Sequence, residues 1–525
     1  MRLKNIIFTA FILSLASCNA EDYKSGEVTF NPDKRLLYCR KAVIRVANHK
    51  TGAGKFYKVN ATAHKNFQDQ YPITPWSTGS KLTDEEIGGT SPKDYIVSWE
   101  NQTVEVVIDL GSLRTIEEVA IHAVADQLYS MKLPSQATLA YSRDNQSWTK
   151  NPNSTTFTSV EPTEHIWSSI PVNKAECRYV KVVLVPPAGE RVAIAIDEIK
   201  VMGEYKTDPK YVPKNGCYHG AFCPLYAYDP EDREGITDAC AVTLFEKMVG
   251  KQLSIMLWYQ NMEQGRNFAE MQDAREKYWS KNFNGTSRIF LYGWTPPTKS
   301  APIAQGSLDD FFKAYFTEVT AQSVKDMGPV WFRPMNEMNG GWISYFRDTK
   351  NYVRAWRRMY NIAEQLGLTA YNVFVWSPNS VSMPNTADNQ MKDYYPGDIY
   401  VDWLGVSCYP PSLSETFPEE KRYPLTLMKD IHTISPDKPI MISEGGYSGG
   451  CDRKRWIREW FEIKTAYPRV KAVIWENHEN TNTENSDRRL QSDPEALELY
   501  KQLVQDPYWL DAIPTEVYQE FESRK

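Results

Sequence analysis

From residue 215 onwards, short hydrophobic runs alternate with longer amphipathic stretches. The runs begin near Tyr218, Leu253, Arg288, Val330, Tyr371, Val401, Pro439 and Val470, about 30 to 42 residues apart. Helix-type patterns lie between them, such as residues 309–327 before Gly328 and residues 351–366 before Gly367. Glycine directly after such a pattern is a common helix stop. Eight strand–helix units of similar length predict a (β/α)8 TIM barrel over residues 215–510.

Residues 35–203 follow a different pattern. Short runs that partly alternate between apolar and polar positions, such as 104–108, 119–122 and 179–184, are separated by polar turns. This alternation and the regular turns predict an antiparallel β-sandwich. Residues 204–214 hold two prolines among charged residues, which predicts a short, semi-rigid linker between the two domains.

Residues 1–18 have the pattern of a secretory signal peptide. A basic start is followed by an apolar run over residues 6–15, which is too short to span a membrane, and then by small residues and Cys18. A cysteine directly after small residues resembles the signal of bacterial lipoproteins. The resemblance implies that Cys18 is lipidated and anchors the protein at the outer membrane or cell surface of a Gram-negative bacterium. A plain signal peptide with an incidental cysteine is the alternative.

Composition narrows the expected partners. The hydrophobic fraction of 42% and the charged fraction of 24% are those of a globular protein. The net charge is −6 and no long Lys/Arg run occurs, so nucleic acid is not an expected partner. The 16 Trp and 31 Tyr residues supply flat rings that suit the faces of sugars. We therefore expect a polysaccharide or an oligosaccharide as the partner. We also expect the protein to be a monomer.

The cysteines do not predict a disulfide framework. Of the 8 cysteines, all but Cys18 are widely scattered, and the number that remains is odd. Cys217 and Cys223 lack the spacing of a C-x-x-C zinc pair. Buried thiols or one local disulfide are favoured there over a metal site.

Two glutamates follow predicted strands of the barrel. Glu337 comes after the fourth hydrophobic run and Glu444 ends the seventh. The chemistry of such barrels lies at the C-terminal ends of the strands, so both side chains are expected at the same mouth. Glycosidic cleavage requires paired carboxyl groups, one to protonate the leaving oxygen and one to attack or to activate water. The pair therefore predicts a glycosidase site.

The segments around these glutamates resemble glycoside hydrolase family 26. The strand-four signature of that family resembles residues 333–342, and its strand-seven signature resembles residues 438–444. The other segments in register are residues 373–379, 395–406 and 470–475. The resemblance implies that Glu337 is the proton donor and later the general base, and that Glu444 is the nucleophile. It also implies retention of anomeric configuration, for which the carboxyl groups lie ~5–5.5 Å apart. No metal or organic cofactor is needed.

The same resemblance assigns roles to four further groups of residues. Arg333 would hold a carboxylate in place, or form a structural salt bridge. Tyr409 would donate its hydroxyl to Glu444, and Trp475 would form the hydrophobic floor under the cleaved sugar. Stacking on sugars in flanking subsites, or packing in the core, is expected for Trp342, Trp376 and Trp294.

Asn336 departs from the family pattern, which usually has His before the acid/base. Asn is common at that position in sister families, where its amide contacts the 2-hydroxyl of the sugar. Because this hydroxyl is axial in mannose and equatorial in glucose and xylose, the change puts β-mannan in doubt. The expected substrate is a β-linked polysaccharide of the β-mannan, mixed-linkage β-glucan or β-xylan type.

The N-terminal region resembles the discoidin-type, jelly-roll galactose-binding sandwich. The segments that carry the resemblance are residues 109–112, 142–148, 178–181 and 197–201. Many such sandwiches act as carbohydrate-binding modules, often with a structural calcium ion, whereas others only brace a catalytic domain. Two alternatives to an endo-acting glycanase also stay open: a glycan-binding lipoprotein without activity, and an exo-acting glycosidase.

Overall fold

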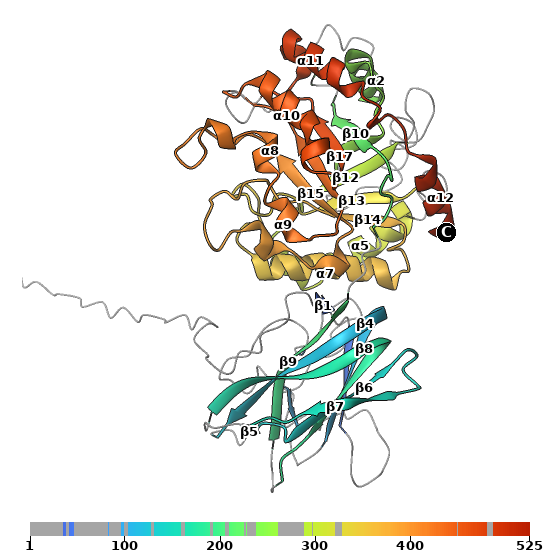
Figure 1. Cartoon of the computed structure of the whole chain (residues 1–525), viewed down its shortest axis with the longest axis vertical. Coiled ribbons are helices and arrows are strands. Elements are labelled where there is room, and N and C mark those ends of the chain that lie inside the picture. The colour runs from blue at the N-terminus through green and yellow to red at the C-terminus, as the bar shows by residue number, and fades with distance from the viewer. Residues whose placement is uncertain are drawn as a thin grey trace, which may run out of the picture. The chain divides into compact units, whose positions relative to one another are not determined.

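The fold comes from a computed structural model. It describes residues 35–37, 41–46, 82, 96–98, 103–127, 131–158, 163–188, 193–204, 209–224, 227, 238–260, 288–296, 298–320, 328–448, 450–479 and 487–524. The predicted signal peptide and Cys18 lie outside the described residues. Contacts divide the chain into two compact units with the boundary after Glu204, and each unit is described by itself (Figure 1).

The described residues of the first unit lie mainly in β-strands. They are β1 (Arg35–Leu37), β2 (Lys41–Val46), β3 (Ile96–Ser98), β4 (Val104–Asp126), β5 (Met131–Lys132), β6 (Gln136–Ser142), β7 (Thr149–Thr155), β8 (Thr163–Val185) and β9 (Ala193–Glu204). The pairing order is β1-β9-β5-β4-β8-β6-β7, with β2 on β4 and β3 on β9. All these pairs are antiparallel except β5–β9. The antiparallel β structure expected for this region is present, and its assignment as a discoidin-type sandwich stays a prediction.

Alternating burial shows why these segments form strands. In β8, Val180, Val182 and Leu184 are fully buried, whereas the residues between them are partly exposed. Such a period of two places one face of the strand against a core.

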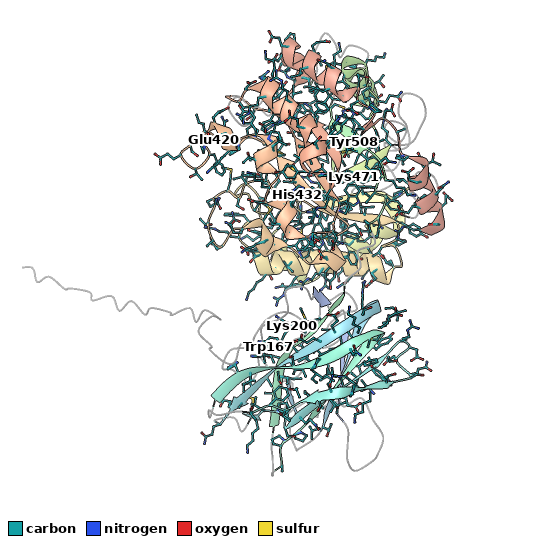
Figure 2. The ribbon with its side chains drawn as sticks, in the orientation of Figure 1. Trp167, Lys200, Glu420, His432, Lys471 and Tyr508 are labelled. Carbon is teal, nitrogen blue, oxygen red and sulfur yellow. The ribbon has the colours of Figure 1, made fainter. Side chains whose placement is uncertain are left out.

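Trp167 and Lys200, both labelled in Figure 2, come from β8 and β9, and the Lys200 ammonium lies 5.1 Å from the Trp167 ring centroid.

The second unit contains eight parallel strands. They are β10 (Cys217–Phe222), β11 (Ile255–Gln260), β12 (Ile289–Trp294), β13 (Val330–Pro334), β14 (Asn372–Trp376), β15 (Trp403–Cys408), β16 (Ile440–Gly445) and β17 (Val470–Glu476). They pair in sequence order, and β10 closes the ring by pairing with both β11 and β17. The predicted TIM barrel is confirmed, and each strand begins within two residues of its expected start.

Helices surround the ring of strands (Figure 1). They are α2 (Asp238–Val249), α4 (Ser300–Ala304), α5 (Asp309–Tyr315), α7 (Thr349–Gln365), α8 (Pro424–Leu427), α9 (Ile431–Ile434), α10 (Arg453–Ala466), α11 (Pro494–Val504) and α12 (Thr515–Arg524). A short strand, β18 (Trp509–Leu510), pairs with β10. The helix expected over residues 351–366 is confirmed by α7, which precedes Gly367 with its positive φ of 73°. The helix expected from residue 309 is α5, which passes into a π-helical turn over Phe316–Thr320. None of the described helices has the length and apolar composition that crossing a membrane requires.

Aromatic residues fill the interior of the barrel. Trp331 of β13 and Trp403 of β15 are fully buried, with ring centroids 4.9 Å apart, and Tyr218 of β10 packs edge-on against Trp331. Every residue of β12, β13, β14, β15 and β16 is buried, as expected for parallel strands covered on both faces. The barrel is therefore a packed core that opens only at its ends.

The prediction of a linker over residues 204–214 is wrong for its second half, residues 209–214. The Lys210 ammonium donates to the carbonyls of Thr369 and Asn372 at 2.6 and 3.1 Å and forms an ion pair with Asp402 at 3.0 Å. The indole of Trp403 in turn donates to the Lys210 carbonyl at 2.8 Å. These partners lie at the N-terminal ends of β14 and β15. Residues 209–214 thus belong to the barrel, because a buried lysine needs acceptors and this end of the barrel supplies them.

Five cysteines of the described residues are free thiols: Cys177, Cys217, Cys223, Cys408 and Cys451. Cys217 and Cys223 are both buried and unpaired, so the local disulfide considered for them is wrong. Burial raises the pKa of the Cys223 thiol to about 12. In the part of the chain that the structure describes, no group of three or more His, Cys, Asp or Glu side chains is arranged to hold a metal ion.

Candidate active site

One cavity at the C-terminal ends of the strands brings the two predicted glutamates together. Glu337 lies on the loop after β13, and Glu444 is the penultimate residue of β16. Both line a cavity of about 640 Å³. The other residues of its wall are Tyr259, Thr295, Asn336, Trp342, Ile343, Asn379, Val381, Met383, Tyr409, Pro410, Pro411, Glu476 and Arg488. Of the predicted site residues, the structure therefore places Asn336, Trp342 and Tyr409 beside the glutamates.

Glu444 is held by a buried cation. Its side chain is 3% exposed, and that of Arg333 is fully buried. One oxygen, Oε1, accepts hydrogen bonds from the Arg333 guanidinium at 2.9 Å and from the Ser407 hydroxyl at 2.6 Å. Arg333 also donates to Ser407 at 2.8 Å. Three strands, β13, β15 and β16, thus position this carboxylate together.

Opposing influences act on the ionisation of Glu444. Burial raises the pKa of Glu444 well above its ordinary value, the nearby Glu476 carboxylate raises this pKa further, and Arg488 lowers it. Burial also lowers the pKa of Arg333 to about 10, an effect that the charge of Glu337 opposes most strongly. The charge-assisted hydrogen bonds on Oε1 favour the ionised carboxylate. The ionised form of Glu444 is therefore stabilised in the cavity by its two hydrogen-bond donors, Arg333 and Ser407.

Glu337 is positioned by its backbone and by two loops. Its φ of 56° lies in the left-handed region, and its amide donates to the carbonyl of Ser377 at 2.8 Å. A non-glycine residue in this region costs about 1–3 kcal/mol and persists only where its surroundings enforce it. The carboxylate accepts from the Asn379 amide at 3.1 Å and from the Trp342 indole at 2.8 Å. The Glu337 carboxylate is thus oriented by one donor on each oxygen.

A reciprocal amide pair joins the loops after β13 and β14. The Asn379 backbone amide donates to the Asn339 side chain at 2.8 Å, and the Asn339 side chain donates back to the Asn379 carbonyl at 2.9 Å. Gly340 lets Trp342 lie over this loop, because a Cβ there would sit 2.4 Å from the indole. Sequence reasoning missed Asn379, although its place three residues after the end of β14 marks it as a strand-end polar residue.

Tyr409 has a different partner from the one expected. Its hydroxyl is hydrogen-bonded to the Glu476 carboxylate, and burial together with that carboxylate raises the pKa of Tyr409 well above its usual range. The Arg488 guanidinium lies 4.3 Å from the Tyr409 ring centroid. The predicted bond to Glu444 is wrong for the described residues, because the Tyr409 hydroxyl pairs with Glu476 instead.

Glu476 is a third carboxylate of the cavity. It ends β17, is 6% exposed, and forms an ion pair with Arg488 at 3.3 Å. The Nδ1 atom of His478 lies 3.2 Å from its carboxylate. Adjacent residues on a strand point to opposite faces. Because Glu476 lines the cavity, its neighbour Trp475 points to the outside of the barrel.

Of the four tryptophans predicted to form the sugar floor or the stacking subsites, three do not line the cavity. Trp475 is fully buried, donates its indole proton to the Arg488 carbonyl at 3.1 Å, and packs against Trp460 of α10. Trp294 is buried against Phe312 of α5, and Trp376 is likewise buried. These three placements correct the expected floor and subsites. Trp342 lines the cavity and is 53% exposed.

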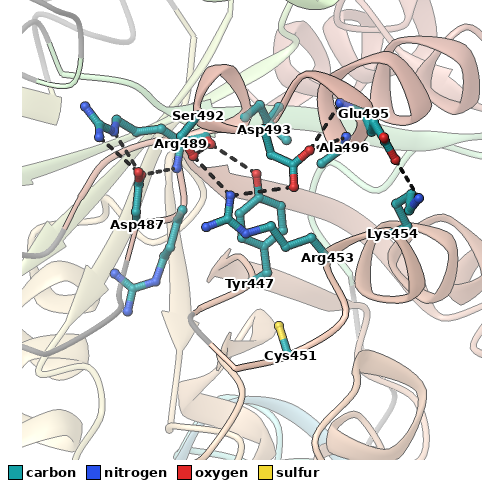
Figure 3. A network of polar contacts seen from close by, with 12 residues as sticks. Tyr447, Cys451, Arg453, Lys454, Asp487, Arg489, Ser492, Asp493, Glu495 and Ala496 are labelled. Atoms are coloured by element: carbon teal, nitrogen blue, oxygen red, sulfur yellow. Dashed lines mark hydrogen bonds and ion pairs between the residues drawn. The ribbon is translucent and has the colours of Figure 1, made fainter.

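A polar network secures the segment that carries Arg488 (Figure 3). The Tyr447 hydroxyl, on the loop after β16, donates to the Arg489 carbonyl at 3.0 Å. Arg453, at the start of α10, donates to Ser492 at 3.2 Å and lies 3.8 Å from Asp493. Asp493 caps α11 by accepting from two of its backbone amides. The segment after β17 is thus fastened to α10, which keeps Arg488 beside Glu476.

Comparisons with known proteins agree with this site. Residues 311–491 match the family model described as glycosyl hydrolase family 26. This match contains both glutamates and supports the resemblance found in the sequence. Together with the relatives below, it supports a glycoside hydrolase.

The relatives share only part of their length with this chain. A stretch of 277 residues is 27% identical to Endoglucanase H of Acetivibrio thermocellus and covers 50% of this chain. Another of 169 residues is 28% identical to Mannan endo-1,4-beta-mannosidase A and B of Caldalkalibacillus mannanilyticus and covers 29% of this chain. The chain spans 29% of the length of each of these relatives. A solved GH26 beta-mannanase from Bacteroides ovatus is 19% identical, with 58% of this chain and 93% of that chain covered at a TM-score of 0.40.

Removing the buried cation should destabilise the protein. The substitution Arg333→Met leaves the Glu444 carboxylate buried without its partner, so we expect the free energy of unfolding at pH 7 to fall by about 3–5 kcal/mol. Urea unfolding measures this loss. Adding Glu444→Gln should recover part of it, because an amide carries no charge.

The pH dependence supplies the check on this prediction. A carboxyl whose pKa is raised in the folded state is destabilising when ionised, and this penalty disappears below its ordinary pKa of about 4.3. The loss of unfolding free energy caused by Arg333→Met should therefore shrink as the pH falls through the pKa of Glu444 in the folded protein. It should be smallest near the ordinary pKa of about 4.3. A loss that is equal at all pH values and unchanged by Glu444→Gln would contradict the assigned ion pair.

Proposed function

We propose that the protein is a retaining, endo-acting β-glycanase that cleaves a β-linked polysaccharide by double displacement. The observation that carries this proposal is the placement of Glu337 and Glu444 in one cavity at the C-terminal ends of β13 and β16. Glu337 donates a proton to the glycosidic oxygen while the Glu444 carboxylate attacks the anomeric carbon. Water, deprotonated by Glu337, then releases the sugar from Glu444 and regenerates both groups.

The surroundings of each glutamate suit its proposed task. Arg333 and Ser407 bind only Oε1 of Glu444, and Oε2 has no hydrogen-bond partner among the described residues. An unpartnered oxygen that belongs to a fixed carboxylate is available for attack. Glu337 is half-buried on a loop, where it can reach a leaving oxygen and then a water molecule.

The proposed substrates are mixed-linkage β-glucan, β-xylan and β-mannan. Asn336 lines the cavity at 6% exposure and is assigned to the 2-hydroxyl of the cleaved sugar. The names of similar proteins include an endoglucanase, a mannan endo-1,4-beta-mannosidase and a beta-1,3-xylanase. The first two names state an endo mode, and the last two state a β linkage.

Separate substitutions of the two glutamates test the proposal. Glu337→Gln and Glu444→Gln should each lower kcat on the cleaved polysaccharide by about 10³-fold or more, while binding of that polysaccharide persists. NMR of the first product should show the β anomer, and sizing should show internal cuts. An α anomer would refute retention, and single sugars as first products would refute the endo mode. Unchanged turnover in both variants would refute the hydrolase itself.

The acid limb of the pH profile should move in opposite directions in two cavity variants. Attack requires ionised Glu444, so kcat/KM should fall as the pH drops through a pKa that burial has raised above about 4.3. Glu476→Gln removes a charge that raises this pKa, and the limb should shift to lower pH. Arg488→Met removes a charge that lowers it, and the limb should shift to higher pH. Shifts of the same sign in both variants would exclude Glu444 as the titrating group.

We further propose that the protein is lipid-anchored through Cys18, at the outer membrane or cell surface, and that its N-terminal strands form a discoidin-type sandwich. The pattern of residues 1–18 supports the anchor. Cys18→Ser should abolish incorporation of labelled palmitate and release the protein from the membrane fraction. Equal labelling of both forms would argue for a plain signal peptide.

A further inference from the structure

A second cavity, of about 330 Å³, adjoins the loop that positions Glu337. Its wall comes from the loop after β14, from Phe417 and from α9. The lining residues are Ser380, Val381, Ser382, Asn385, Gln390, Met391, Lys392, Phe417, Asp430, Thr433 and Ile434. At ~30 Å³ for each water molecule, it holds on the order of ten waters. A cavity of this volume has room for one monosaccharide unit.

The wall contains a buried polar group without a partner. Ser380 is 4% exposed, and its Oγ has no hydrogen-bond partner among the described residues. An unsatisfied buried hydroxyl costs about 1–3 kcal/mol. A ligand with its own hydroxyl groups would satisfy Ser380, and so would bound water.

The remaining polar groups of this cavity carry both signs of charge. The Lys392 ammonium and the Asp430 carboxylate are exposed at its wall, and neither forms an ion pair within the described part of the chain. Phe417 adds a half-buried ring. Hydroxyl groups of a neutral sugar can accept from Lys392 and donate to Asp430, and an apolar sugar face suits the ring. The balanced charges give no net attraction for an anionic ligand.

One residue joins this cavity to the catalytic one. Val381 lines both. Its amide donates to the Asn379 side-chain oxygen at 3.0 Å, and the same side chain donates to Glu337. Two cavities with a common wall can hold two sugars of one branched molecule. This relation to Glu337 distinguishes the second cavity from an unrelated surface pocket.

We propose that the second cavity binds a neutral, single-sugar branch of the polysaccharide whose main chain lies in the catalytic cavity. The inference rests on the proposed glycanase function. It assigns Phe417 and Lys392 to recognition of the branch, with Ser380 completing the hydrogen bonds at the base. The protein would therefore select decorated polysaccharides over bare chains.

Matched substrates test this proposal. Galactomannan, arabinoxylan and xyloglucan are each compared with the same backbone after enzymatic removal of its branches, and mixed-linkage β-glucan serves as an unbranched substrate. Lys392→Ala should lower kcat/KM on the cleaved branched polysaccharide by about tenfold, the size expected for one lost hydrogen bond to a charged group. Phe417→Ala should lower it by up to about tenfold, the size expected for one lost aromatic contact. On the debranched chain kcat/KM should stay unchanged. The control Lys429→Ala alters an exposed lysine outside the cavity and should change neither value.

The outcomes separate the two proposals. Equal losses on branched and debranched chains, or no loss on either, would overturn the branch site and leave the glycanase intact. The branch site would also be overturned if the protein cleaved debranched and unbranched chains but no branched polysaccharide. Wild-type protein that cleaves none of these polysaccharides would instead refute the proposed function itself.

Discussion

The buried ion pair between Arg333 and Glu444 is the interaction on which the cavity depends. Taking either charge out of water costs several kcal/mol, and each is tolerated because the other is present. Since the pair joins β13 to β16 across the barrel, it can form only when the ring of strands has closed. The position of the proposed nucleophile is thus a consequence of barrel closure.

The two glutamates are held by different means, and this difference fits different tasks. Glu444 lies within a strand, is nearly inaccessible, and is fixed by charge. Glu337 lies on a loop with a left-handed backbone and is oriented by neutral donors, Asn379 and Trp342. A strand-held carboxylate suits attack at a fixed point, and a loop-held one can serve first a leaving oxygen and then water.

A second layer of interactions controls the charge in the cavity. Glu476 and Arg488 form an ion pair, yet they act in opposite directions on the pKa of Glu444. Trp475 lies beneath this pair and hydrogen-bonds the Arg488 backbone, and the network around Arg453 holds the same segment to α10. Trp475, which sequence reasoning assigned to the floor under the cleaved sugar, therefore supports the charged wall from behind.

The sequence by itself determined the barrel, the start of each strand and the two glutamates at strand ends, because hydrophobic periodicity and position along a strand are local properties. The tertiary structure alone decided which side chains face the cavity and which partners they take. Tyr409 bonds Glu476, Trp475 faces α10, and Lys210 joins the barrel, because each choice depends on segments brought together only by folding. Competition among distant donors and acceptors for the same buried atoms leaves no trace in a local pattern.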